Sequence, residues 1–285
     1  MSLLGTTGRR LRVQHQTRYS YFGTVSASYN EARMSPRTEA RQQVLESRLD
    51  VGPLGWRHDY DDYWGTAVTA FETHVPHQEL IVTGTTVADV GEIGAAPQTD
   101  WDRLGSERTR DTFAESLTAT QRSATPAELV LLAAERIGDQ PPHLAAQEVC
   151  ALVCETMQYA TGSTGVQTLA SEAWQARRGV CQDFAHLAVG ALRSVGIPAR
   201  YVSGYYASRR DAEIGEAVLG ESHAWIEWWT GGWYGWDPTN NHPASSRHLV
   251  VGRGRDYGDV PPLKGIVAGS GRSDLDVTVT VTVLR

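Results

Sequence analysis

Three residues of this chain, Cys181, His223 and Asp237, are the types that together attack an amide carbonyl, and Asp237 lies only 56 positions after Cys181. A thiol is a weak nucleophile until a neighbouring base takes its proton. The base in turn needs an acceptor that fixes its tautomer and ring plane. The order nucleophile, base and carboxylate therefore indicates an enzyme that works through a thiolate.

Cys181 lies where a loop is expected to become a helix. The segment 177–180 is followed by residues 181–189, whose apolar positions recur at helical spacing. The positive end of the helix dipole and the unpaired backbone N–H groups of a first turn favour a thiolate. The same N–H groups can stabilise an oxyanion on a substrate carbonyl.

His223 and Asp237 are expected on two strands of one hairpin. The runs 223–230 and 232–236 are rich in tryptophan, and Thr230-Gly231-Gly232 is a typical hairpin turn between them. His223 stands eight residues before Gly231, and Asp237 five after Gly232. The pairing is approximate, but it predicts that the two side chains lie side by side.

Each of the three residues also has an ordinary interpretation. Cys181 alone is more often a small core residue, His223 a hydrogen-bonded strand residue, and Asp237 before a proline a turn former. The alternative to an enzyme is therefore a catalytically inactive binding or scaffold module. The combination of all three with a helix start and a hairpin favours catalysis.

Around these residues the pattern predicts an α+β chain. Strands at 11–21, 42–51, 67–74 and 80–87 predict an N-terminal antiparallel β-sandwich. Helices are expected from about residue 110, including 129–137 behind a capping box at Thr125–Glu128, 143–157, 169–177 and the Cys181 helix. We expect an N-terminal β domain at 1–105 and a catalytic core at 106–285, in which a helix bundle packs on an antiparallel sheet. The strand at 274–285 is expected to pack back on the first domain.

Four sequence blocks resemble the bacterial transglutaminase-like family. They are Gly179–His186, Gly196–Tyr205, Ser222–Trp225 and Trp236–Asn240, and the later segment Gly252–Pro262 is also similar. The resemblance implies a papain-like core with a Cys-His-Asp triad behind an N-terminal β domain. It implies Cys181 as nucleophile, His223 as general base and Asp237 as its orienting carboxylate. Members of the family include amide cross-linkers, peptidases and deglycosylating amidases.

The remaining site residues are predicted less directly. The oxyanion donors are expected to be the backbone N–H of Cys181 and a side chain ahead of it, with Gln158, Tyr159 and Trp174 as candidates. Asp183, Trp225 and Trp236 are candidates for the substrate pocket, because the dense tryptophans of 225–236 can wall a cleft. His186 is expected to be structural or to line the pocket.

Composition excludes several other classes of protein. The net charge of −7 and the pI near 5.7 argue against nucleic-acid binding, which needs a basic patch. No run approaches 18 apolar residues, so we expect no membrane contact and a soluble cytoplasmic protein whose free thiol stays reduced. Cys150 and Cys154 are expected to be buried and inert, and Met1-Ser2-Leu3 carries no structural prediction.

No cofactor or metal is expected. The chain has no P-loop and no calcium-binding loop spacing, and His242 and His248 lack an evident set of metal-ligand partners. The leading hypothesis is thiol-dependent acyl transfer or hydrolysis at amide bonds of peptides or proteins, through a thioester on Cys181. A primary amine acceptor would complete cross-linking, and water would complete hydrolysis.

Overall fold

The computed structural model describes residues 8–209, 211–220, 222–269 and 272–285, and its longest element is strand β1 (Arg9–Ala32). On one side β1 pairs with β5 (His77–Val90) and β4 (Ala67–Thr73). On the other side it pairs with β15 (Ser273–Val283) and β14 (Leu263–Gly269). All of these pairings are antiparallel. Met1-Ser2-Leu3 lie outside the described residues.

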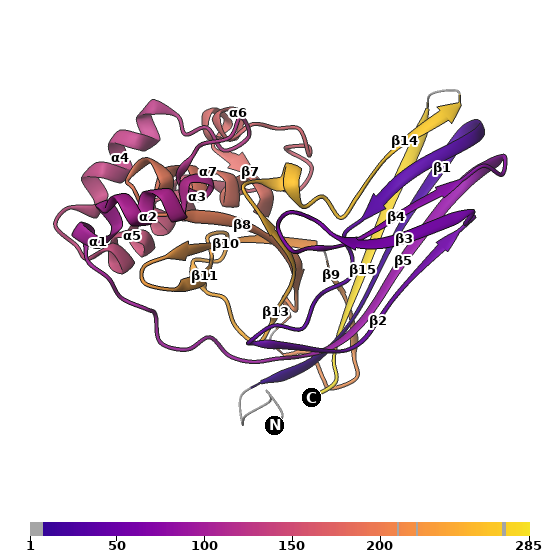
Figure 1. Cartoon of the computed structure of the whole chain (residues 1–285), viewed down its shortest axis with the longest axis horizontal. Coiled ribbons are helices and arrows are strands. Elements are labelled where there is room, and N and C mark those ends of the chain that lie inside the picture. Colours follow the sequence, from indigo (N-terminus) through magenta and orange to yellow (C-terminus); the bar gives the residue numbers. More distant parts are fainter. Residues whose placement is uncertain (1–7, 210, 221, 270–271) are drawn as a thin grey trace.

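The sheet around β1 folds over into two layers. The register between β1 and β5 breaks between Ser20 and Val25. Tyr19 and Leu263 pack against the same hydrophobic cluster, although the strand partner of Leu263 is Ala32, the last residue of β1. The long strands accordingly reverse at one end of the sheet (Figure 1). One layer has the order β2-β5-β1-β15-β9 and the other β3-β4-β1-β14, with β2 at Gln42–Gly52, β3 at Trp56–Asp61 and β9 at Ala217–Gly220. The predicted sandwich therefore forms from one continuous sheet.

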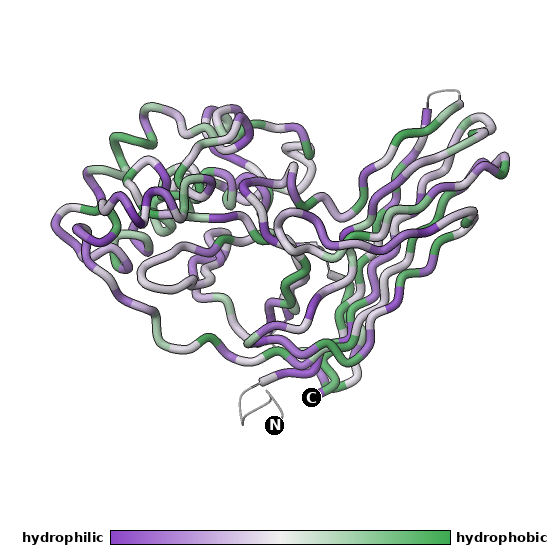
Figure 2. The backbone as a smooth tube through the Cα atoms, viewed as in Figure 1, coloured by the Kyte–Doolittle hydropathy of each residue, from purple (hydrophilic) through white to green (hydrophobic). Residues whose placement is uncertain are grey.

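Alternation of residue types sets the register of this sheet. Leu11 and Val13 of β1 are buried against Val281 and Val283 of β15, while the intervening residues are polar. Figure 2 shows hydrophobic and hydrophilic residues alternating along these strands. Because side chains on a strand alternate between faces, a slip of one residue would expose the whole apolar set.

The helices gather on the other side of the molecule (Figure 1). They are α1 (Trp101–Gly105), α2 (Glu107–Thr112), α3 (Ala114–Leu117), α4 (Ala127–Ile137), α5 (Pro142–Thr156), α6 (Ala170–Ala176) and α7 (Cys181–Ser194). In α7 every residue from Gln182 to Arg193 is buried, so this helix is the centre of the catalytic half. Its burial fixes the position of Cys181 at its first turn.

A second antiparallel sheet carries the other predicted catalytic residues. Its order is β12-β11-β10-β8-β13, with β8 at Ala199–Tyr206, β10 at Ser222–Trp229, β11 at Trp233–Asp237, β12 at His242–Pro243 and β13 at His248–Gly254. The short strands β6 (Gln158–Tyr159) and β7 (Arg178–Gly179) pair in parallel, and a 3-10 turn, η1, covers Tyr257–Asp259. The hairpin of β10 and β11 turns at Gly231, whose φ of +100° suits glycine.

Three details differ from expectation. Helix starts at Trp101 rather than near residue 110, and the predicted capping box at Thr125–Glu128 is absent. Pro126 is the N-cap of α4, and the Glu128 carboxylate binds Trp174 and Arg177 instead. The boundary at residue 105 also does not divide the chain cleanly, because β9 and β14 of the second half join the N-terminal sheet. The strand expected at 274–285 packs back on that sheet as β15, which pairs with β1. None of the described helices is both long and apolar enough to cross a bilayer.

Candidate active site

Cys181 is the first residue of α7, and a buried carboxylate locks the helix start beneath it. Oδ2 of Asp183 accepts the backbone N–H of Val180 at 2.8 Å and the hydroxyl of Thr164 at 2.6 Å. A Cβ at Gly179 would lie 2.6 Å from that carboxylate, so only glycine fits there. Asp183 was a candidate either for the substrate pocket or for a structural role; it does not line the cavity, because its side chain is fully buried and supports the helix.

His223 lies near the start of β10, where Gly204 of β8 is its strand partner. Its Nε2 is 2.8 Å from Oδ2 of Asp237. The rings of Tyr206 and Trp225 stack on the imidazole with centroids at 5.1 and 6.2 Å. These contacts hold the ring plane. Because Nε2 is bonded to Asp237, Nδ1 is the nitrogen left for the Cys181 thiol, which lies close enough to raise the pKa of His223.

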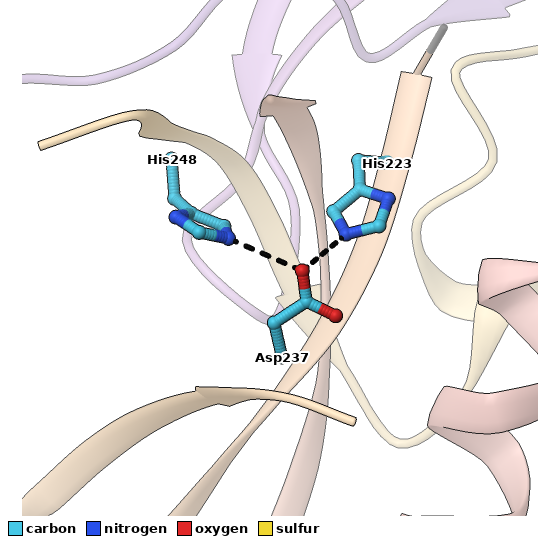
Figure 3. A group of neighbouring side chains, drawn as sticks. All are labelled: His223, Asp237 and His248. Carbon is cyan, nitrogen blue, oxygen red and sulfur yellow. Dashed lines mark hydrogen bonds and ion pairs between the residues drawn. The ribbon is translucent and has the colours of Figure 1, made fainter. Parts of the chain in front are cut away.

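Asp237 is fully buried, and hydrogen-bond donors surround its carboxylate. Oδ1 accepts the backbone N–H groups of Thr239 at 2.9 Å and Asn240 at 3.2 Å. Oδ2 accepts the side-chain amide of Asn240 at 2.7 Å besides the two imidazoles of His223 and His248 (Figure 3). The turn after β11 therefore supplies most of the partners that a buried charge requires.

The charges of His223 and Asp237 stabilise each other. Burial works against the charged form of His223, but the hydrogen bond and the attraction of Asp237, followed by those of Cys181, raise the pKa of His223 to about 10. Burial also opposes ionisation of Asp237, yet attraction to His223 and the hydrogen bonds hold the pKa of Asp237 well below its usual range. The site therefore favours an imidazolium beside a carboxylate at neutral pH.

His248 is a site residue that sequence reasoning missed. Its Nδ1 accepts the backbone N–H of Ser245 at 3.1 Å, and a backbone amide can only donate. The proton of the neutral ring is therefore on Nε2, which donates to Asp237 Oδ2 at 3.4 Å. Burial lowers the pKa of His248 to about 4, so this neutral form persists at pH 7. No motif in the sequence marks this residue.

His248 was expected to lack a set of metal-ligand partners, and this expectation is wrong. Ligand atoms of His223, Asp237 and His248 lie within 4.8 Å of one another, close enough to hold a metal ion. In this arrangement, however, both Nε2 atoms direct protons at the carboxylate. The donor set fits a hydrogen-bond network that orients His223. The thiol mechanism proposed for this site requires no metal.

Cys181 and His223 open into a cavity of about 410 Å³ between the two halves of the molecule. Gln182, Tyr201 and Tyr257 line it from the catalytic half. The N-terminal sheet contributes its inner face, with these residues: His15, Thr17, Tyr19, Leu275, Val277 and Val279. The cavity wall thus combines Cys181 and His223 with apolar side chains from β15 and with polar and aromatic side chains from β1.

The start of α7 provides backbone donors for an oxyanion. The N–H groups of Asp183 and Phe184 bond back to the Val180 carbonyl, whereas those of Cys181 and Gln182 have no acceptor among the described residues. They are among the four N–H groups that a helix leaves unpaired at its N-terminus. The backbone of Cys181 was predicted as a donor, but that of Gln182 was not.

The three side chains proposed as the second donor have different positions. Trp174 is buried and donates its indole N–H to Glu128 at 2.8 Å, so its candidacy is wrong. Gln158 is exposed on β6 and does not line the cavity of Cys181. Tyr159 lines a neighbouring cavity of about 580 Å³ that also reaches His223. Only Tyr159 thus lies in a cavity that reaches the imidazole.

The tryptophans predicted to wall the pocket do not reach it. Trp225 lies on the same face of β10 as His223 but two residues further along, where it lines a different cavity, while Trp236 lies in the main core. Strand alternation directs Trp236 away from the face that carries Asp237. Of the other two thiols, Cys150 is buried as expected, whereas Cys154 is only half-buried, with its Sγ 3.7 Å from the Thr239 carbonyl.

His186 and Tyr257 show how the C-terminal segment completes the site. The buried His186 accepts the backbone N–H of Tyr257 through Nε2 at 3.1 Å, and burial lowers its pKa to about 4. The expected structural role of His186 is therefore to anchor η1. Tyr257, which was not predicted, is thereby held in the cavity wall.

Comparison with known proteins agrees with this geometry. Residues 132–238 match the transglutaminase-like superfamily, and residues 11–89 match the bacterial transglutaminase-like N-terminal region. The chain is 42% identical to an uncharacterised protein of Mycobacterium leprae, over 96% of this chain and 98% of that one. A Mycobacterium tuberculosis protein is 34% identical over 99% of this chain and 94% of its own length. The chain belongs to the transglutaminase-like superfamily.

Two further similarities are more distant. A protein-glutamine gamma-glutamyltransferase of Pseudomonas aeruginosa is 30% identical over half of this chain and a fifth of its own length. The solved structure of a candidate cysteine protease from Cytophaga hutchinsonii covers 98% of this chain and 91% of its own, with a TM-score of 0.78 and 19% identity. At that identity the likeness shows the shared fold, including the N-terminal sheet.

Proposed function

We propose that this protein is a thiol enzyme that cleaves an amide bond of a peptide or protein through a thioester on Cys181. The observation that carries the proposal is that His223 is hydrogen-bonded to the buried Asp237 and lines, together with Cys181, one cavity that can admit substrate. The similarity to a glutamyltransferase supports a glutamine side-chain amide as the acyl donor.

In the first half-reaction the Cys181 sulfur attacks the amide carbonyl carbon, and the carbonyl oxygen takes the negative charge. The N–H groups of Cys181 and Gln182 at the start of α7 would receive that oxyanion. When the C–N bond breaks, His223 gives its proton to the departing nitrogen, which leaves as ammonia or an amine. Asp237 keeps the ring oriented throughout.

In the second half-reaction a new nucleophile attacks the thioester. His223, now neutral, accepts a proton from a primary amine or from water, and the Cys181 thiolate departs as the new bond forms. An amine gives a cross-linked or modified amide, and water gives an acid. The apolar side chains of β15 in the cavity wall would lower water access and so favour the amine.

The test is incubation with a library of glutamine-containing peptides and a labelled primary amine. Mass spectrometry then scores amine incorporation, conversion of the side-chain amide to an acid, and cleavage of the peptide chain. Cys181→Ala is the control. The proposal predicts at least one of these products with the wild type and none with Cys181→Ala. Binding without any product would support an inactive binding module of the same fold instead.

A further inference from the structure

One stretch of the N-terminal sheet has an open edge beside the catalytic cavity. Strand β9, which comes from the catalytic half, pairs with β15 only from Val279 to Thr282. On that side of β15, no described strand pairs with residues 273–278. The edge thus continues past the end of β9, and Leu275 and Val277 of this stretch line the cavity that contains Cys181.

The register shows which backbone groups face this open side. Phe22 N–H donates to the Arg272 carbonyl, and Leu284 N–H to that of Arg10, so the even-numbered residues of β15 bond to β1. The odd-numbered residues point their N–H and C=O groups the other way, and the Val283 carbonyl accordingly accepts from Gly215. Leu275 and Val277 therefore present to the open side backbone donors and acceptors that no strand among the described residues pairs with.

The side chains of the same two residues are apolar and accessible. Leu275 is 56% exposed and Val277 48% exposed, and both face the cavity together with Tyr19 and Thr17 of β1. The alternate residues Asp274 and Asp276 lie on the opposite face of the sheet. Proteins usually blunt an exposed apolar edge because it recruits another strand. Here such an edge lines the same cavity as Cys181.

We propose that the acyl-donor peptide binds in extended form as an additional strand on β15 at Leu275–Val277, in line with β9; this rests on the proposed function. An extended main chain matches the edge because it offers one donor and one acceptor on every second residue. The protein's own β9 already occupies the next part of the edge in this way. Alternate side chains of the peptide would face the apolar wall of the cavity, which would select apolar residues there.

The first test uses peptides that carry a single N-methyl group. Take the best glutamine peptide from the library screen, with about six residues so that it spans about 20 Å, and methylate one backbone nitrogen at a time. Measure kcat/KM with the wild-type enzyme. The proposal predicts a loss of roughly tenfold at alternate nitrogens and little change at those between, because only every second N–H meets β15.

The second test removes one outward N–H. Val277→Pro does so without breaking a bond to β1, and proline is tolerated on an edge strand. Val267→Pro is the matched control, because Val267 of β14 has the same outward register but does not line this cavity. We expect KM for the peptide to rise roughly tenfold in Val277→Pro and to stay unchanged in Val267→Pro.

The possible outcomes separate this inference from the proposed function. Turnover of the peptide with no alternation in the N-methyl series, and equal KM in the two proline variants, would overturn the docking strand and leave the chemistry standing. If no peptide of the library is turned over or bound, both proposals fail. The N-methyl series decides the matter if Val277→Pro does not fold.

Discussion

His248 donates its Nε2 proton to Oδ2 of Asp237, the same oxygen that accepts from the catalytic imidazole of His223 (Figure 3). The backbone N–H of Ser245 fixes this tautomer. Asp237 is thus held from two sides, and His248 acts on the reaction only through it. We infer that His248 is a positioning residue.

Replacing His248 should therefore lower activity without removing the nucleophile. His248→Ala loses a hydrogen bond to a charged group, which costs about 1.5–3 kcal/mol, or roughly 10- to 100-fold in kcat. His248→Gln should recover most of the loss, because an amide can both accept from Ser245 and donate to Asp237. A steady-state assay of both variants, with exposed His74→Ala as control, checks this. Equal loss in the Ala and Gln variants would contradict the positioning role.

The alkaline limit of activity should follow His223. Its pKa is raised from 6.5 to about 10, so the proton needed by the leaving nitrogen is present below pH 10 and lost above it. In Asp237→Asn the charge that raises this pKa is gone and only a weaker, neutral hydrogen-bond acceptor is left, while burial still lowers it. We expect the alkaline limb of kcat/KM to move toward neutral pH and the maximum to fall roughly 100-fold. A limb that stays in place would show that another group sets it.

The sequence predicted the helices, strands and turns that local patterns specify. The spacing of apolar residues around Cys181, the Thr230-Gly231-Gly232 turn and the alternation from Leu275 to Val283 each specify an element, and all three appear. The fold class followed from them, as did the convergence of His223 and Asp237 across one hairpin.

What the sequence did not predict depends on contacts between distant segments. His248 joins the site because β13 pairs with β8, and no local pattern sets that partner. Trp236 was misplaced because composition does not say which face of a strand meets a cavity, and Trp225 because the cavity lining on β10 stops at Ala224. The wall supplied by β1 and β15 likewise requires knowing how the two halves pack.

A buried ion cluster beside the site should dominate stability. Glu227 of β10 lies 2.7 Å from Arg200 and 2.8 Å from Arg253, measured from its Oε2 to each Nε. Glu227→Gln leaves both cations without their buried partner, which we expect to cost about 3–5 kcal/mol in the free energy of unfolding. Urea unfolding at pH 7 measures this. Glu79→Gln, which removes the exposed pair with Arg18, should cost no more than about 1 kcal/mol.

The same cluster predicts a pH dependence with a defined sign. Burial opposes ionisation of Glu227, but Arg253 and Arg200 lower its pKa from 4.5 to about 2. Stability from this group is therefore complete above pH 4.5 and is lost as pH falls toward 2. The difference between wild type and Glu227→Gln should shrink over that range. A constant difference would mean that the carboxylate charge is not what stabilises the fold.

The most direct measurement for the whole account is the rate at which iodoacetamide alkylates each cysteine at pH 7, followed by mass spectrometry of the digested protein. Burial raises the pKa of both Cys150 and Cys154, so these thiols should react slowly. Cys181 should react at least roughly tenfold faster, because the neighbouring His223 can take the proton of its thiol. That advantage should disappear in His223→Ala. Equal rates for the three thiols, or an advantage that survives the loss of His223, would contradict the catalytic arrangement described here.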